Sequence, residues 1–211
     1  ACGQRASSST QVHTMNLVTN QVELRVSPDR NVAPSQVTLR VSIDIDHPVA
    51  DIQWDFQGDG IIDAQGQDLH EQSVTFTQPG LYLPKVSVTD TMGNRFDATA
   101  VVQVLDPGAF EAMLNHEWSG MMEALAQGEI EQALLFIALS KREVMRHDWT
   151  VLKDHLDELA AIFAVPLHLT DGQGTRVVAQ ASAPLAFGPI QFPLEVEFIL
   201  DTDGQWRIRN F

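Results

Sequence analysis

The sequence predicts two folded units: an all-β sandwich, followed by an α+β unit with three helices and a curved antiparallel sheet. Three observations predict this division. Residues 21–105 contain short alternating runs separated by turn residues at intervals of roughly 8–12 positions, with no helical period. From Asp106 onward, apolar residues recur at helical spacing in three stretches, and four alternating runs follow. The length of 211 residues suffices for two units of about 100 residues each.

The first segment, residues 1–20, is predicted to be a tether that contains one cysteine, Cys2. It begins Ala1-Cys2-Gly3 and continues small, polar and Ser-rich. Cys2 is the single cysteine, and its surroundings resemble the lipidated cysteine that follows a bacterial lipoprotein signal. We therefore expect lipidation at Cys2; the alternative is a chance cysteine at the start of a fragment. Residues 12–20 either add an edge strand or belong to the tether.

The predicted sandwich spans residues 21–105. Alternation of apolar and polar residues predicts strands over 21–26, 37–45, 50–56, 74–76, 81–89 and 98–105. In the third of these, Ile52, Trp54 and Phe56 fall on one face. Pro84 lies inside the fifth run, and proline cannot donate to a ladder. We therefore expect that strand to be an edge strand or to be bulged at this point.

Two motifs in the sandwich resemble a known family. The first runs from Trp54 to Gly60, and the second comprises Phe76, Pro79, Gly80, Tyr82, Val86, Val88, Asp90 and Gly93. Together they resemble the polycystic kidney disease (PKD) domain, whose Trp-Asp-Phe-Gly-Asp-Gly signature here has Gln57 as an extra residue. The resemblance implies an Ig-like β-sandwich over residues 21–105. Such domains are usually extracellular, and they are usually spacers or interaction modules, not enzymes.

The acidic loop in the first motif has two interpretations. Asp55, Gln57, Asp59 and Asp63, with the Ile61 carbonyl, follow the ligand spacing of an EF-hand loop, so calcium is a candidate cofactor. However, the twelfth position is a glycine where a bidentate Glu is needed, and no helices flank the loop. The alternative is a turn in which the Asp side chains accept hydrogen bonds from backbone N–H groups.

The second unit, residues 106–211, begins with three predicted helices. In the first helix, Asp106 is the expected N-cap, Pro107 takes the first helical position and Gly128 ends the helix. A second helix is expected from Ile130 to about Arg146, and a third, capped by Asp148 or Thr150, continues to residue 163. Strands are then expected over 167–170, 176–183, 192–200 and 205–211.

The last two of these strands predict a hairpin whose register follows from its loop. A three-residue loop at 202–204 pairs Leu200 with Trp206, Ile199 with Arg207, Phe198 with Ile208 and Glu197 with Arg209. A two-residue loop would mix the two faces, because a slip of one residue reverses every side chain. The three-residue loop with Gly204 in the left-handed conformation is therefore favoured.

The order of elements in residues 107–211, together with Gly128–Leu134 and Asp203–Ile208, resembles the nuclear transport factor 2-like superfamily. This resemblance implies helices that wrap a cone-shaped sheet; its members are enzymes or binding modules. The single tyrosine, Tyr82, lies in the sandwich, which excludes a Tyr-based oxyanion site in the second unit. His147, Asp148, His155 and Asp157 lie near one helix junction. They are candidates for a base or a metal site, or simply a solvated helix face.

The charge of the chain restricts its partners. The formal net charge is −15, with −6 before Asp106 and −9 from it onward, so we expect no nucleic-acid partner. No catalytic motif is present, and the sequence therefore favours a non-enzymatic, bacterial cell-envelope or secreted protein. It would join a spacer or adhesion module to a domain that binds a ligand, a protein or a surface glycan. The alternatives are a small enzyme or small-molecule binder on a β-sandwich stalk, and a subunit of an extracellular assembly that pairs through residues 10–20.

Overall fold

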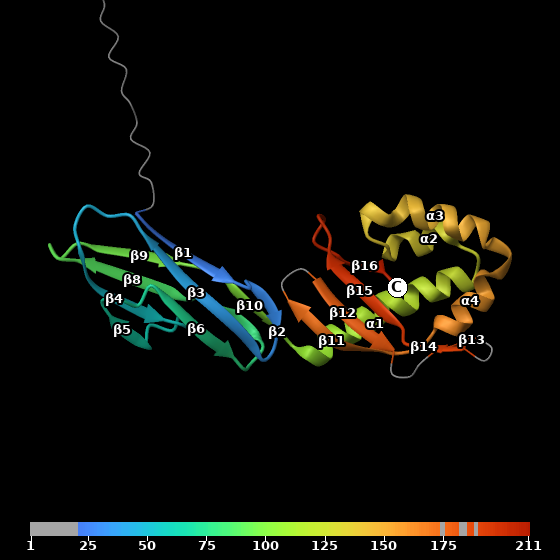
Figure 1. Cartoon of the computed structure of the whole chain (residues 1–211), viewed down its shortest axis with the longest axis horizontal. Helices are drawn as coiled ribbons and strands as arrows, with labels where there is room; N and C mark the ends of the chain where they lie inside the picture. The colour runs from blue at the N-terminus through green and yellow to red at the C-terminus, as the bar shows by residue number, and fades with distance from the viewer. Residues whose placement is uncertain (1–20, 174–175, 182–184, 188–189) are drawn as a thin grey trace, which may run out of the picture.

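The computed structural model describes residues 21–173, 176–181, 185–187 and 190–211. The first part, here called the β-region, comprises residues 21–105, and the second, the α+β region, comprises residues 106–211. The two regions follow one another along the long axis of the molecule (Figure 1). Cys2 and the segment 12–20 lie outside the described residues, so their predicted roles stay predictions.

The β-region contains ten strands. They are β1 (Val22–Ser27), β2 (Arg30–Val32), β3 (Ser35–Ile43), β4 (Val49–Asp55), β5 (Ala64–Gly66), β6 (Glu71–Phe76), β7 (Gly80–Tyr82), β8 (Lys85–Asp90), β9 (Arg95–Thr99) and β10 (Val102–Leu105). They form sheets with the orders β1-β3-β6, β5-β4-β8-β9 and β2-β10-β7. One apolar core is shared by all three sheets, because alternating residues of β3, β4, β8 and β10 point toward it. This arrangement agrees with the predicted β-sandwich.

Trp54 lies at the centre of this core. Both Trp54 and Ile52 are fully buried, and the Trp54 Nε1 donates to the Leu69 carbonyl at 2.9 Å. The indole N–H is thus satisfied inside an apolar environment. Phe56, predicted on the same face, lies just beyond the end of β4 and is half-buried.

The strand predicted over 81–89 is two strands that belong to different sheets. β7 pairs with β10, whereas β8 pairs with β4 and β9, and the chain passes from one sheet to the other at Leu83–Pro84. Pro84 has no N–H for a ladder, while its carbonyl accepts from Ala100 N at 3.0 Å. The run predicted over 98–105 is divided in the same way into β9 and β10.

The α+β region contains four α-helices and six strands among the described residues. The helices are α1 (Pro107–Ala126), α2 (Ile130–Ala133), α3 (Arg142–Val151) and α4 (Leu156–Phe163), with 3-10 turns at Leu134–Phe136, Leu139–Lys141 and Lys153–His155. The strands are β11 (Leu167–Gln173), β12 (Arg176–Ala181), β13 (Leu185–Phe187), β14 (Ile190–Phe192), β15 (Glu195–Leu200) and β16 (Trp206–Asn210). β11-β12-β15-β16 form an antiparallel sheet, and β13-β14 form a separate hairpin that was not predicted.

The prediction of one helix from Ile130 to about Arg146 is wrong. The chain is extended at Ile137, where φ is −90° and ψ is 139°. There it forms a parallel bridge with Ile208, and Ala138 N donates to the Ile208 carbonyl at 2.8 Å. Pairing with the edge of β16 therefore interrupts the helix. As a consequence α3 starts at Arg142, and Val151, predicted in the third helix, ends α3 instead.

The predicted register of the last hairpin is confirmed for three pairs. Leu200 pairs with Trp206, Ile199 with Arg207 and Phe198 with Ile208. Gly204 has a φ of 79°, as the three-residue loop requires. Glu197 pairs with Asn210 instead of Arg209 because the register shifts between Glu197 and Phe198. The Glu197–Arg209 ion pair nevertheless forms, at 3.3 Å.

Candidate functional site: the groove between α1 and α4

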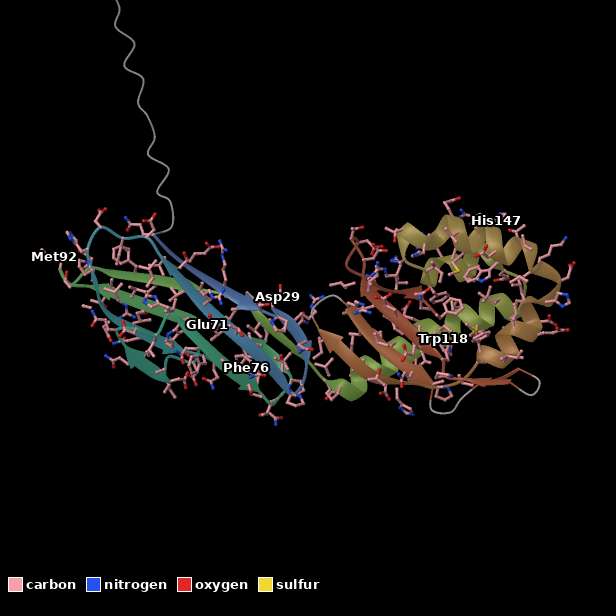
Figure 2. All side chains as sticks on the ribbon, viewed as in Figure 1. Asp29, Glu71, Phe76, Met92, Trp118 and His147 are labelled. Atoms are coloured by element: carbon pink, nitrogen blue, oxygen red, sulfur yellow. The ribbon has the colours of Figure 1, made fainter. Side chains whose placement is uncertain are left out.

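One face of helix α1 packs into the core of the α+β region, and another face forms one wall of a groove. Asp106 Oδ1 accepts from Ala109 N at 2.7 Å, which confirms the predicted N-cap. Phe110, Leu114, Trp118, Met121 and Leu125 are buried at helical spacing. The Trp118 Nε1 donates to the Phe163 carbonyl at 3.0 Å, which fixes the end of α4 against α1. Figure 2 labels Trp118 within this helical layer.

The edge of the sheet is fastened to α1 by polar side chains. Asn115 Nδ2 donates to the Leu167 carbonyl, and Asn115 Oδ1 accepts from Leu167 N, both at 2.8 Å. Glu111 Oε2 accepts from Leu169 N at 2.9 Å, and its Oε1 lies 3.1 Å from His168 Nδ1. These bonds satisfy backbone groups that an edge strand would otherwise leave open. They also join α1 to β11 at the position where the groove begins.

The groove itself lies between α1 and α4 and has a volume of about 690 Å³. Its floor consists of buried Met122, Trp118 and Ala160. Its walls consist mostly of small, exposed residues, since large side chains are absent from the facing positions of the two helices. These wall residues are Ala112, Ser119 and Ala126 on α1, and Ala161 and Ala164 on and after α4. Val165 and Pro166 close one end.

Two carboxylates and one histidine border this apolar groove. Glu123 lies on α1 and Asp157 on α4, while His116 lies on α1. All three side chains are exposed, and none forms a hydrogen bond or an ion pair within the described part of the chain. The remaining polar side chains are already engaged: Asn115 bonds to Leu167, and Ser119 donates to the His116 carbonyl at 3.2 Å. The groove is therefore apolar inside and negatively charged on both walls.

A smaller apolar cleft lies beside the groove. It has a volume of about 230 Å³ and is bordered by α1, α3, α4 and the last residue, Phe211. Met122 and Ala160 border both spaces, so these two side chains separate the groove from the cleft. Trp149 and Phe163 are among the aromatic residues that surround the cleft, and Asp148 is the one charged residue that borders it among the described positions. Such a space suits a small apolar molecule.

The acidic loop in the β-region shows the capping arrangement. Asp55 Oδ1 accepts from Gly58 N at 2.7 Å and from Asp59 N at 3.1 Å, and its Oδ2 accepts from Gly60 N at 2.8 Å. Asp63 Oδ2 accepts from Phe56 N at 2.6 Å, and Asp59 Oδ1 accepts from Ile61 N at 2.9 Å. These carboxylates thus stabilise the turn.

Calcium at this loop stays a prediction. Asp55 ends β4, and Gln57, Asp59, Ile61 and Asp63 lie in the loop that follows it. The described residues contain no group of three or more His, Cys, Asp or Glu side chains arranged to hold a metal ion.

The four residues near the helix junction do not form one site. His147 lies exposed on α3 (Figure 2), and Asp148 borders the cleft. His155 contacts Glu158 at 3.4 Å on the surface, whereas Asp157 borders the groove. The structure therefore supports the solvated-face interpretation for His147 and His155. Asp157 is the one residue of this set that belongs to the candidate site.

No family model and no curated protein matches the chain. Solved structures do match it, among them the following three. The PKD1 domain of the Vibrio cholerae metalloprotease PrtV is 19% identical, with a TM-score of 0.30, and the match covers 39% of this chain and 95% of that domain. The PKD1 domain of Vibrio anguillarum Epp is 23% identical, with a TM-score of 0.33, and the match covers 41% of this chain and 93% of that domain. The fibronectin(III)-like modules of Clostridium thermocellum CbhA are 18% identical, with a TM-score of 0.34, and the match covers 39% of this chain and 93% of that chain.

Several PKD domains are therefore among the structures similar to this chain. More than half of the chain is left uncovered by each of these three matches.

Sequence reasoning missed the groove. Helix α1 was predicted correctly. The third predicted helix ends at Phe163, as α4 does, but its start was placed several residues before Leu156, and about 30 residues separate α1 from α4. A signal was nevertheless present. Ala112, Ser119 and Ala126 recur every seven residues on one face of α1, where a helix that is covered by a neighbour would carry larger apolar residues.

Proposed function

We propose that this protein is a non-enzymatic cell-envelope or secreted protein with two domains. Residues 21–105 serve as a spacer or adhesion module, and residues 106–211 bind a ligand or a protein, with the helices and sheet in the cone-like arrangement of the nuclear transport factor 2-like superfamily. Its partners are a protein or a glycan at the cell surface. The β-sandwich of the β-region, with its shared core, supports the spacer role.

The groove between α1 and α4 carries the proposal for the second domain. Its volume of about 690 Å³ falls within the usual range for binding sites, and its floor is apolar. Three titratable residues border it, His116, Glu123 and Asp157, and they do not contact one another through any hydrogen bond or ion pair in the described part of the chain. An apolar lining with a few polar groups at its margin is typical of a binding site.

Capture from the envelope fraction tests the proposal. The wild-type chain and an Ala161→Trp variant are each used as bait, with and without EDTA. Ala161 is exposed on the groove wall, so the tryptophan fills the groove without entering the core. Val151→Trp is the matched control, because Val151 is 70% exposed on α3 and borders neither space. We expect a partner that is lost with Ala161→Trp and retained with Val151→Trp. Equal capture by all three chains would show that the groove is not the site.

A second candidate function is that of a small-molecule binder, which the cleft favours. The cleft of about 230 Å³ is lined almost entirely by apolar side chains, including Trp149, and apolar cavities of this size hold small hydrophobic molecules. Titration with an apolar fluorescent dye, read through the emission of the dye itself, tests this alternative. Loss of dye binding in a Leu159→Trp variant, which fills the cleft, supports it.

The predicted location rests on residues 1–20, which the structure does not describe. Among the described residues, no helix combines the length and apolar character that a membrane span requires. Mass spectrometry of Cys2 from the native membrane fraction tests lipidation directly. Self-assembly through residues 10–20 is tested by light scattering of the chain with and without this segment.

A further inference from the structure

We infer that the occupant of the groove between α1 and α4 is a basic, amphipathic helical segment of a partner protein. This inference rests on the function proposed for residues 106–211 and names the chemistry of the partner. Three features carry it: the shape of the groove, its small walls and the sign of its charge.

The shape of the groove suits a helix. On α1 the groove runs from Ala112 to Ala126, about 21 Å, since an α-helix rises about 1.5 Å per residue. The opposite wall is α4 and the two residues that follow Ala164. An apolar trough between two helices is the surface on which an amphipathic helix binds with residues at i, i+3, i+4 and i+7.

The small residues on both walls determine how closely a partner approaches. Ala112, Ser119 and Ala126 on α1 face Ala161 and Ala164 across the groove. These small side chains let the backbone of a third helix lie low between the walls. Its Leu or Met side chains would then pack on the alanine methyl groups, above the buried floor of Met122 and Trp118.

The charge of the groove selects a basic partner. Glu123 and Asp157 lie on opposite walls, and neither has a hydrogen bond or ion pair in the described part of the chain. No Lys or Arg borders the groove among the described residues. A helix with Lys or Arg on both flanks of its apolar face would therefore gain an ion pair on each side. The net charge of −15 adds a long-range attraction that speeds the encounter.

Fluorescence anisotropy with three labelled helical peptides tests the inference. Each peptide has about 15 residues and the same leucine face; the flanking residues are Lys in the first, Glu in the second and Gln in the third. At low salt we expect the Lys peptide to bind at least tenfold more tightly than the Glu peptide. Ala161→Trp should abolish binding, and Val151→Trp should not. Circular dichroism confirms that each variant is folded.

A charge-matched pair separates groove binding from general attraction to an acidic protein. Asp157→Lys and Asp154→Lys change the net charge equally, but Asp157 alone borders the groove. We expect Asp157→Lys to weaken the Lys peptide about fivefold more than Asp154→Lys does, because an exposed ion pair is worth up to about 1 kcal/mol. Equal weakening overturns the inference.

The other outcomes are equally decisive. Tight binding of all three peptides, lost with Ala161→Trp, overturns the basic partner but leaves the groove as a binding site. Absence of binding by every peptide overturns the helical partner. The envelope capture with Ala161→Trp then decides separately whether the proposed function stands.

Discussion

Asn115 of α1 pairs with both backbone groups of Leu167 in β11, through two hydrogen bonds of 2.8 Å each. The side-chain amide thus occupies the place that a neighbouring strand would take at this edge of the sheet. Removal of the amide leaves a buried donor and acceptor unpaired, so we expect Asn115→Ala to lower the free energy of unfolding by about 1–3 kcal/mol.

Urea unfolding measures this change. Gln132→Ala, on the exposed surface of α2, is the control and should stay within about 0.5 kcal/mol of the wild type. Two variants of equal stability would contradict the role assigned to Asn115.

Glu111 makes the stability of the same edge depend on pH. The Leu169 N–H and the nearby His168 ring hold the pKa of the Glu111 carboxyl below its ordinary value. A carboxyl whose pKa is depressed by folding contributes stability at neutral pH, and this contribution is lost as the pH falls below about 4.5. We therefore expect Glu111→Gln to be less stable than the wild type at pH 7, and the difference to shrink toward pH 3. Urea unfolding across this range measures it; a difference that does not change with pH would argue against this assignment.

Gly58 and Gly60 form a matched pair in the acidic loop. Both have positive φ, 77° and 89°, so an alanine costs about 1 kcal/mol or more at either position. A Cβ at Gly58 would also clash with the Leu83 carbonyl oxygen, whereas nothing lies within 4 Å at Gly60. Gly58→Ala should therefore lower the thermal midpoint clearly more than Gly60→Ala. Equal losses would mean that the contact with Leu83 does not constrain the loop.

Gly120 is a second position where a Cβ does not fit. It would lie 2.6 Å from the Phe136 ring, which packs against the core of the α+β region. We expect Gly120→Ala to cost about 1–3 kcal/mol despite the better helix propensity of alanine. Gly108→Ala in the same helix has room, 3.5 Å from Asp106, and should be neutral or stabilising. Denaturant unfolding compares the two variants, and a stabilised Gly120→Ala would contradict this packing.

Calcium binding at Asp55–Asp63 is tested by thermal unfolding with excess Ca²⁺ and with chelator. An ion bound by the folded state alone must raise the midpoint in Ca²⁺. Asp63→Asn serves as the control that should remove such a shift. Identical midpoints in Ca²⁺ and in chelator would contradict a calcium site and leave these carboxylates as caps of the turn.

The sequence predicted those parts of the fold that depend on neighbouring residues. The register of Leu200 with Trp206 followed from the loop at Gly204, and the burial of Trp54 followed from alternation. What it did not predict depends on distant partners. The break at Ala138 requires the carbonyl of Ile208, 70 residues away, and local helical spacing carries no sign of it.

The candidate site was less accessible to prediction than the fold. Asp157 was singled out for its charge, but its role as a groove residue depends on the place of α4 beside α1. The exposed alanines that form the walls have no distinctive chemistry, and only the packing of the two helices leaves a space between them.

In the proposed function, residues 106–211 bind their partner in the groove between α1 and α4. Amide chemical shifts of the isotopically labelled chain, recorded during titration with the Lys-flanked peptide, test it most directly. We expect the largest changes to cluster between Ala112 and Ala126 and between Asp157 and Val165. Changes centred on the β-region, for example around the exposed Leu81 and Val101, would contradict it.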